Sequence, residues 1–168
     1  MPTPYTSMSA TIATGLLGTT GGTQNLVERG YQLLDSTAIP VGRGVVFDAS
    51  NSSTSGTAVK LPSATGQKFM GIARINPLIQ EIDGTMTYVE GDEVTVVEQC
   101  PNGVWVTATE AVTPADPVYM QHTTNGGRLP GTFRKDSDSN NADLVDGATL
   151  RWADSFGAGL ARLTISLP

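Results

Sequence analysis

The chain has 168 residues, of which 39 % are hydrophobic and only 15 % are charged. This length suffices for one domain with a buried core, and the composition excludes the charge-rich, apolar-poor class of disordered proteins. The formal net charge is −6 and the ten Lys and Arg residues are spread along the sequence, which excludes the basic patch that direct binding to nucleic acid requires.

The first 30 residues differ from the rest because they are rich in Thr, Gly, Ser and Ala and carry only two charges. They contain no Lys or Arg before Arg29, so we expect no secretory leader. Two interpretations of residues 1–30 stay open: a loosely packed terminus, or an extended arm that becomes ordered on another subunit. We favour the arm, because apolar burial at about 25 cal/mol per Å2 can offset an ordering cost of ~1–2 kcal/mol per residue. Its interface residues would be Tyr5, Met8, Ile12, Leu16 and Leu17.

From about Leu33 onward, short apolar or alternating runs separated by Gly, Pro, Asn and Ser predict β-strands. Within KFMGIARI, Gly71 marks a bulge or a close approach of two backbones. The only helical candidate is a short segment at residues 26–34. A strand spacing of roughly eight to twelve residues favours an all-β fold, a single antiparallel barrel or sandwich-like domain over residues 31–168. The predicted strands are 41–47, 58–61, 68–75, 85–89, 94–98, 104–112, 118–121, 149–152 and 160–167.

Residues 85–112 predict a meander of three strands. A turn at Glu90–Glu93 would separate the first two strands, and a turn at residues 101–103, containing Pro, Asn and Gly, would separate the last two. In the third strand, the alternation predicts that Trp105 points away from its two valine neighbours.

Clustered carboxylates are the first candidates for chemistry. Glu90, Asp92 and Glu93 share one tight turn, whereas catalytic acid pairs usually come from different strands. The stretch DSDSNNAD at residues 136–143 resembles the start of a calcium loop, but the sixth and twelfth positions lack the required Gly and acid. We therefore predict a structural turn and a solvated polar loop.

Cys100 and His122 are the only Cys and His of the chain, which excludes an intrachain disulfide and the usual structural zinc site. We expect Cys100 to be a small packed residue and His122 to lie in a loop or at a strand edge. Trp105 and Trp152 fit core aromatics better than a carbohydrate-binding platform. No apolar run approaches the ~20 residues that cross a bilayer. We predict no catalytic residue, no cofactor, no metal and no membrane contact.

Four segments occur in a characteristic order: FMGIAR at Phe69–Arg74, YVEGDEVTVVEQCPNGVWVTATEAVTPADPVYM at Tyr88–Met120, GRLPGTF at Gly127–Phe133, and GATLRWADSFGAGLARLTISLP at Gly147–Pro168. Their order and spacing resemble the structural cement, or head-decoration, proteins of tailed bacteriophages. The most specific part combines GDEV, GVWV and DPVY in succession. EQCPNG departs from the plainer glycine turn expected there, because it carries Cys100 and Pro101.

The resemblance implies a β-rich, non-enzymatic virion protein on the outer surface of an icosahedral head, made in the host bacterial cytoplasm. It implies that the protein clamps adjacent subunits of the major capsid protein and helps the shell to hold packaged DNA. The expected partners are the major capsid protein and further copies of this chain, as a homotrimer or alternatively a dimer. Two other hypotheses stay open: another virion β-module, from a tail or fibre or binding carbohydrate, and a hydrolase that uses the acids near Asp92.

Overall fold

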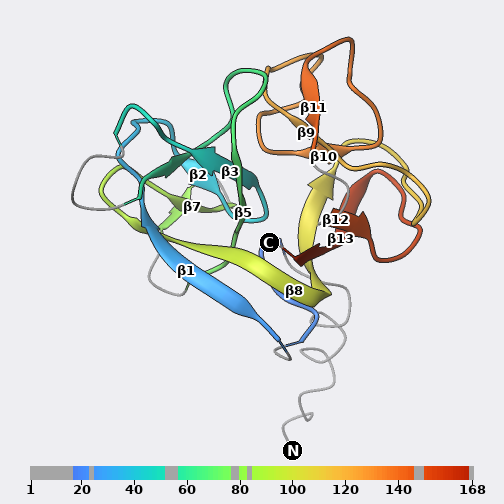
Figure 1. Ribbon diagram of the computed structural model, residues 1–168, viewed down its shortest axis with the longest axis horizontal. Coiled ribbons are helices and arrows are strands. Elements are labelled where there is room, and N and C mark those ends of the chain that lie inside the picture. Colours follow the sequence, from blue (N-terminus) through green and yellow to red (C-terminus); the bar gives the residue numbers. More distant parts are fainter. Residues whose placement is uncertain are drawn as a thin grey trace, which may run out of the picture.

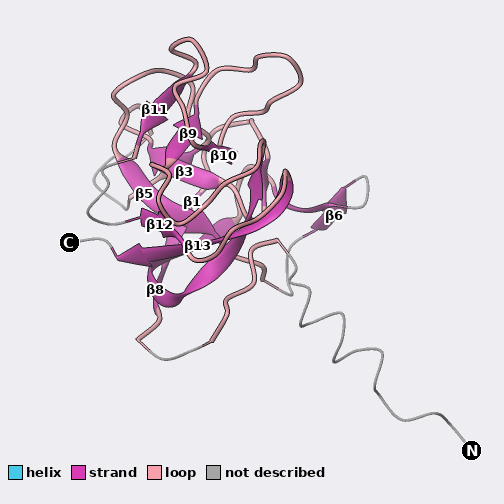
Figure 2. Cartoon of the chain, turned by 90° about the vertical axis from the view of Figure 1, so that its right-hand side faces the viewer, coloured by secondary structure: helices cyan, strands magenta, loops and turns pink. Residues whose placement is uncertain are grey.

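The computed structural model describes residues 17–22, 25–51, 57–76, 80–82, 85–145 and 150–166, and over these residues it contains thirteen β-strands and no helix (Figure 1). The predicted all-β class is therefore confirmed. The strands form a ten-stranded and a three-stranded sheet in a sandwich-like arrangement, and the larger sheet does not close into a barrel (Figure 2).

The bounds of the strands show how short most of them are. The small sheet has the order β2 (Ile39–Pro40), β7 (Thr85–Tyr88) and β6 (Gln80–Ile82). The large sheet contains β1 (Val27–Gln32), β3 (Gly44–Phe47), β4 (Val59–Lys60), β5 (Phe69–Ala73), β8 (Glu93–Ala108), β9 (Tyr119–Gln121), β10 (Phe133–Arg134), β11 (Ala142–Leu144), β12 (Leu150–Trp152) and β13 (Gly159–Ser166).

Strand β8 organises the fold because β1, β5, β10 and β13 all pair with it. Three of these pairings are antiparallel, whereas β10 pairs in parallel through Phe133 and Ala108, so the large sheet is mixed. β1 pairs with the first half of β8 and β13 with the second half. β8 thereby connects the end of the molecule that carries the small sheet with the end that carries β9, β10 and β11 (Figure 1).

The turn predicted at residues 101–103 is wrong, because β8 runs through these residues without reversing. β13 pairs with β8 on both sides of them, and its register shifts between Leu163 and Ile165, which marks an irregularity of the bulge type. Gly103 has a φ of 82°, which glycine adopts without steric cost. A turn sequence is thus accommodated inside a strand when a partner strand continues past it.

The predicted meander is also wrong, since β7 belongs to the small sheet and pairs with β2 and β6. The turn at Glu90–Glu93 is present, but it leads the chain from the small sheet into the large one. The helical candidate at residues 26–34 is wrong because β1 forms there. Tyr31 and Leu33 alternate into the core while β1 pairs with β8, and this tertiary pairing outweighs local helix propensity.

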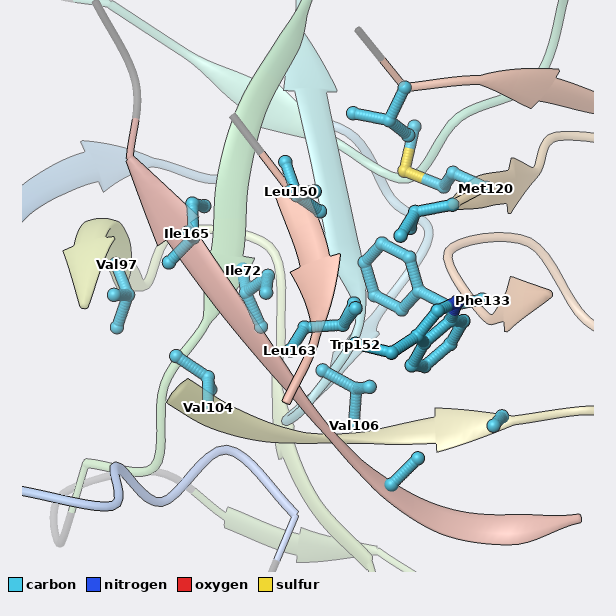
Figure 3. Close-up of a cluster of buried hydrophobic side chains, with 14 of the residues drawn as sticks. Ile72, Val97, Val104, Val106, Met120, Phe133, Leu150, Trp152, Leu163 and Ile165 are labelled. Atoms are coloured by element: carbon cyan, nitrogen blue, oxygen red, sulfur yellow. The ribbon is translucent and has the colours of Figure 1, made fainter. Parts of the chain in front are cut away.

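Two clusters of buried side chains form the core. Figure 3 shows the rings of Phe133 and Trp152 beside Val106 in the first cluster, with Leu163 and Ile165 of β13 extending it. Trp152 is a core residue as predicted, and its indole N–H donates a hydrogen bond to a backbone carbonyl at 3.3 Å. The second cluster consists of Tyr31, Leu33, Ile39, Val41, Val45, Val59, Ala73, Tyr88, Val94 and Val96.

Candidate functional site

The acidic turn at Glu90–Glu93 uses its central carboxylate to hold its own backbone. The Asp92 carboxylate accepts a hydrogen bond from the Val89 N–H at 2.8 Å, and the Asp92 N–H donates to the Val89 carbonyl at 3.0 Å. Glu90 and Glu93 lie exposed on the surface. Asp92 therefore closes a turn, which is the structural role that the sequence predicted.

Cys100 and His122 have separate partners in the structure. The Cys100 thiol is fully buried in β8 and lies 3.4 Å from the Gly103 carbonyl, and burial raises its pKa, which disfavours the nucleophilic thiolate. His122 is buried just after β9, with Nδ1 2.9 Å from the Thr123 hydroxyl and Nε2 3.7 Å from a carboxylate oxygen of Asp143. Cys100 is thus a packed residue as predicted, and His122 lies in the loop at the end of β9 as expected, with its side chain buried.

The polar loop at residues 136–143 contains a buried carboxylate, so the prediction of a solvated loop is wrong at Asp138. Its side chain is 7 % exposed and lies between β9 and β10 residues. It accepts hydrogen bonds from Gln121 at 2.8 Å and Asn125 at 3.1 Å. It also pairs with Arg128 at 2.8 Å and Arg134 at 3.2 Å. Four side chains from residues 121–134 therefore converge on one carboxylate.

This network sets the ionisation of Asp138. Desolvation raises the pKa of the Asp138 carboxyl, but the hydrogen bonds from Gln121 and Asn125 and the charges of Arg134 and Arg128 outweigh it, so the pKa lies below its ordinary value. Across the part of the chain that the structure describes, no group of three or more His, Cys, Asp or Glu side chains is placed to hold a metal ion. The network therefore fits a structural role, in which it holds together the end of the molecule that carries β9, β10 and β11.

The two tryptophans do not form an aromatic platform. Trp152 is buried, and the half-buried ring of Trp105 meets Phe156 edge-on, with ring centroids 5.6 Å apart. The Arg162 guanidinium lies 5.8 Å from the centroid of the Trp105 ring. As predicted, Trp105 points away from buried Val104 and Val106.

Sequence reasoning missed an open groove of about 680 Å3 that is built by three segments far apart in the sequence. Two Leu-Pro dipeptides, at residues 61–62 and 129–130, are the only sequence signal that marks its walls. The groove is lined by Asp35, Thr37, Ala38, Pro40, Arg43, Lys60, Leu61, Pro62, Ser63, His122, Thr123, Thr124, Leu129 and Pro130.

Within the predicted arm of residues 1–30, residues 17–22 lie along β8 of the same chain. The Gly18 N–H donates to the Trp105 carbonyl at 2.8 Å, and the Trp105 N–H donates to the Thr19 carbonyl at 2.9 Å. Leu17 is half-buried and packs against the second core cluster of the same chain. The other predicted interface residues, Tyr5, Met8, Ile12 and Leu16, lie outside the described residues.

Comparison with known proteins identifies the family. The family described as structural cement protein (E217 gp24/Pam3 gp6) matches residues 1–166. The chain belongs to the structural cement protein family. A solved structure, the capsid of Myoviridae phage XM1, contains a chain of the same fold, with a TM-score of 0.66 and 20 % sequence identity over 90 % of this chain and 89 % of that chain. No protein with a curated description matches the chain.

Several large apolar side chains of this cement protein face solvent. Leu129 and Leu144 are 48 % and 55 % exposed, and both belong to the end that carries β9, β10 and β11. Val27, Leu34 and Ile82 are also exposed. No helix among the described residues is long and apolar enough to cross a membrane. As a member of this family, the cement protein has a structural role in the virion, in association with the capsid.

Proposed function

We propose that this cement protein binds the outer surface of an icosahedral phage head and clamps adjacent subunits of the major capsid protein, which stabilises the DNA-filled shell. The observation that carries the proposal is the family match over residues 1–166. The structure supports it because Asp92 of the acidic turn and the Asp138 network serve the fold, which favours a non-enzymatic protein.

The proposed partners are the major capsid protein and further copies of this chain, with a homotrimer favoured. Several copies that grip a repeating lattice reinforce one another, because each bound contact raises the effective concentration of the next. Symmetric association also suits a protein that meets symmetry-related capsid subunits. Modest contacts at each subunit then suffice for durable attachment.

The test is cosedimentation of the purified chain with heads of the encoding phage that were assembled without it. We expect saturable pelleting at a fixed ratio to the major capsid protein, and the ratio would identify the symmetry position. The bound heads should also release less DNA on heating than undecorated heads. No pelleting onto mature, expanded heads would overturn the proposal.

We further propose that the part of residues 1–30 that precedes the segment bound to β8 acts as an arm, with its interface formed by Tyr5, Met8, Ile12 and Leu16, whereas Leu17 packs against the core of its own chain. The structure determines where to cut, because residues 17–22 hydrogen-bond to β8 and β1 begins at Val27. Deletion of residues 1–16 should therefore weaken head binding at least tenfold while the thermal midpoint of unfolding stays within about 2 °C.

The matched control keeps the length of the arm and replaces Tyr5, Met8, Ile12 and Leu16 with serine. It should bind as weakly as the truncated protein, since the apolar side chains are what the arm contributes. Wild-type binding by both variants would remove the arm from the attachment mechanism and leave the role of the β-domain intact.

A further inference from the structure

Part of the lining of the groove described above is apolar. Pro40, Pro62 and Pro130 lack a backbone N–H, and Leu61 and Leu129 add apolar surface. Leu129 is 48 % exposed although it sits in a well-anchored loop. Exposed leucine beside several prolines leaves an apolar surface that gains free energy when another chain covers it.

The loop that carries Leu129, at the edge of the groove, is fixed by hydrogen bonds. Its backbone carbonyl accepts hydrogen bonds from the Thr132 hydroxyl at 2.7 Å and from Arg43 at 3.3 Å. The preceding residues are tied down by Asn125 and Arg128, which both reach the buried Asp138. A loop that is fixed in this way loses little conformational entropy on binding, so an exposed apolar side chain on it is suited to docking.

The charges of the groove are unevenly compensated. Lys60 pairs with the fully buried carboxylate of Asp48 at 3.2 Å, and Asp35 accepts a hydrogen bond from the Thr37 N–H at 2.8 Å. Arg43 donates to the Leu129 and Pro130 carbonyls, and among the described residues no carboxylate lies within ion-pair distance of its guanidinium. Burial lowers the pKa of Arg43, which reflects incomplete solvation of its charge.

We propose that this groove docks an extended segment of the phage head surface, with an acidic side chain that pairs with Arg43 and an apolar side chain that packs against Leu129 and Leu61. The inference rests on the proposed attachment to the head and deepens it. Charge complementarity selects the occupant: a carboxylate supplies the partner that Arg43 lacks, and guanidinium–carboxylate pairs are favoured when they form in a partly dry site. A neutral segment would leave Arg43 desolvated and unpaired.

The test compares variants of the full chain for cosedimentation with heads of the encoding phage assembled without it. Leu129→Ser and Arg43→Gln should each weaken binding at least tenfold. The matched controls are Leu144→Ser, an exposed leucine outside the groove, and Arg151→Gln, an exposed arginine of β12, which should bind within twofold of wild type. Added salt should weaken wild-type binding more steeply than Arg43→Gln binding, because it screens the proposed ion pair.

A photo-crosslinking amino acid placed at position 129 identifies the occupant on decorated heads. We expect the crosslinked peptide to come from a head protein and to contain Asp or Glu within about three residues of the attachment point, the span of one short extended segment. Crosslinking to a second copy of this chain, or to a segment without an acid, would overturn the inference.

The outcomes also separate this inference from the proposed attachment. Wild-type pelleting with unimpaired Leu129→Ser and Arg43→Gln variants would overturn the groove and leave attachment standing. Absence of wild-type pelleting would overturn both. If Arg43→Gln misfolds, the binding of Leu129→Ser decides whether the groove docks the head. The Leu129 side chain is 48 % exposed, so it can be replaced without opening the core.

Discussion

Replacing Gly71 with alanine should destabilise the protein by about 3–5 kcal/mol, combining backbone strain with overpacking. Gly71 lies in β5 with a φ of 138°, a conformation that side chains disfavour. A Cβ atom there would lie 2.4 Å from the Val97 carbonyl oxygen and 2.6 Å from a methyl carbon of Val96. Because these atoms belong to β8, relief of the clash would separate β5 from the strand that organises the fold. Urea unfolding measures the loss of the free energy of unfolding.

Gly159 provides the control, since its φ of 118° is similar but no atom lies within 4 Å of the position of an added Cβ. Gly159→Ala should therefore show backbone strain alone, about 1–2 kcal/mol. An equal loss in the two variants would show that the close approach of β5 to β8 contributes nothing beyond the strained φ.

Local patterns predicted those features whose cause lies within a few residues. Gly71 was expected to mark a bulge or a close backbone approach, and the structure confirms both, because the β3–β5 register shifts beside it and β8 lies against it. The opposite orientation of Trp105 relative to Val104 and Val106 follows from strand alternation. The all-β class likewise follows from many short strands divided by turn residues.

Patterns failed where a distant strand decides the conformation. Residues 101–103 carry strong turn signals, yet β13 pairs with β8 before and after them and keeps the strand continuous. The segment at residues 26–34 lacks a clear period of two, and pairing with β8 makes it a strand. In both places the deciding hydrogen bonds come from residues dozens of positions away, which a short window does not contain.

The groove and the Asp138 network were missed for the same reason. A run of acids and polar residues predicts a solvated loop. No residue close to Asp138 in the sequence indicates that its carboxylate has partners inside the folded protein. The pairing of β9 with β10 and β11 brings Gln121 and Arg134 beside that loop. The walls of the groove are likewise assembled from segments that meet only in the folded protein.

Replacing Asp138 with asparagine should lower the free energy of unfolding by about 3 kcal/mol, the low end for breaking a buried ion pair. The change removes the charge that faces Arg134, whose side chain is 5 % exposed, and weakens the anchor of Arg128. Arg134 keeps the partially exposed Asp136 as a partner at 2.5 Å, which limits the loss. Asp136→Asn is the matched control, and it should cost less than about 1 kcal/mol because the Asp136 side chain is 57 % exposed. Equal losses would contradict a central role for Asp138.

The pH dependence of stability gives this prediction a second test. The pKa of Asp138 in the folded protein lies below its ordinary value, whereas in the unfolded chain it is about 3.9. The unfolded state therefore binds the proton more tightly, so the contribution of Asp138 is fully present above about pH 4 and is lost as the pH falls through the folded-state pKa. The difference in stability between wild type and Asp138→Asn should shrink on acidification below about pH 4, while carboxylates outside this network titrate alike in both proteins. If the difference in stability stayed constant down to the pH at which the protein unfolds, the shape of the Asp138 side chain, and not its charge, would account for its contribution to the network. Because the same network anchors the loop that carries Leu129, head binding by Asp138→Asn should weaken in parallel with its stability.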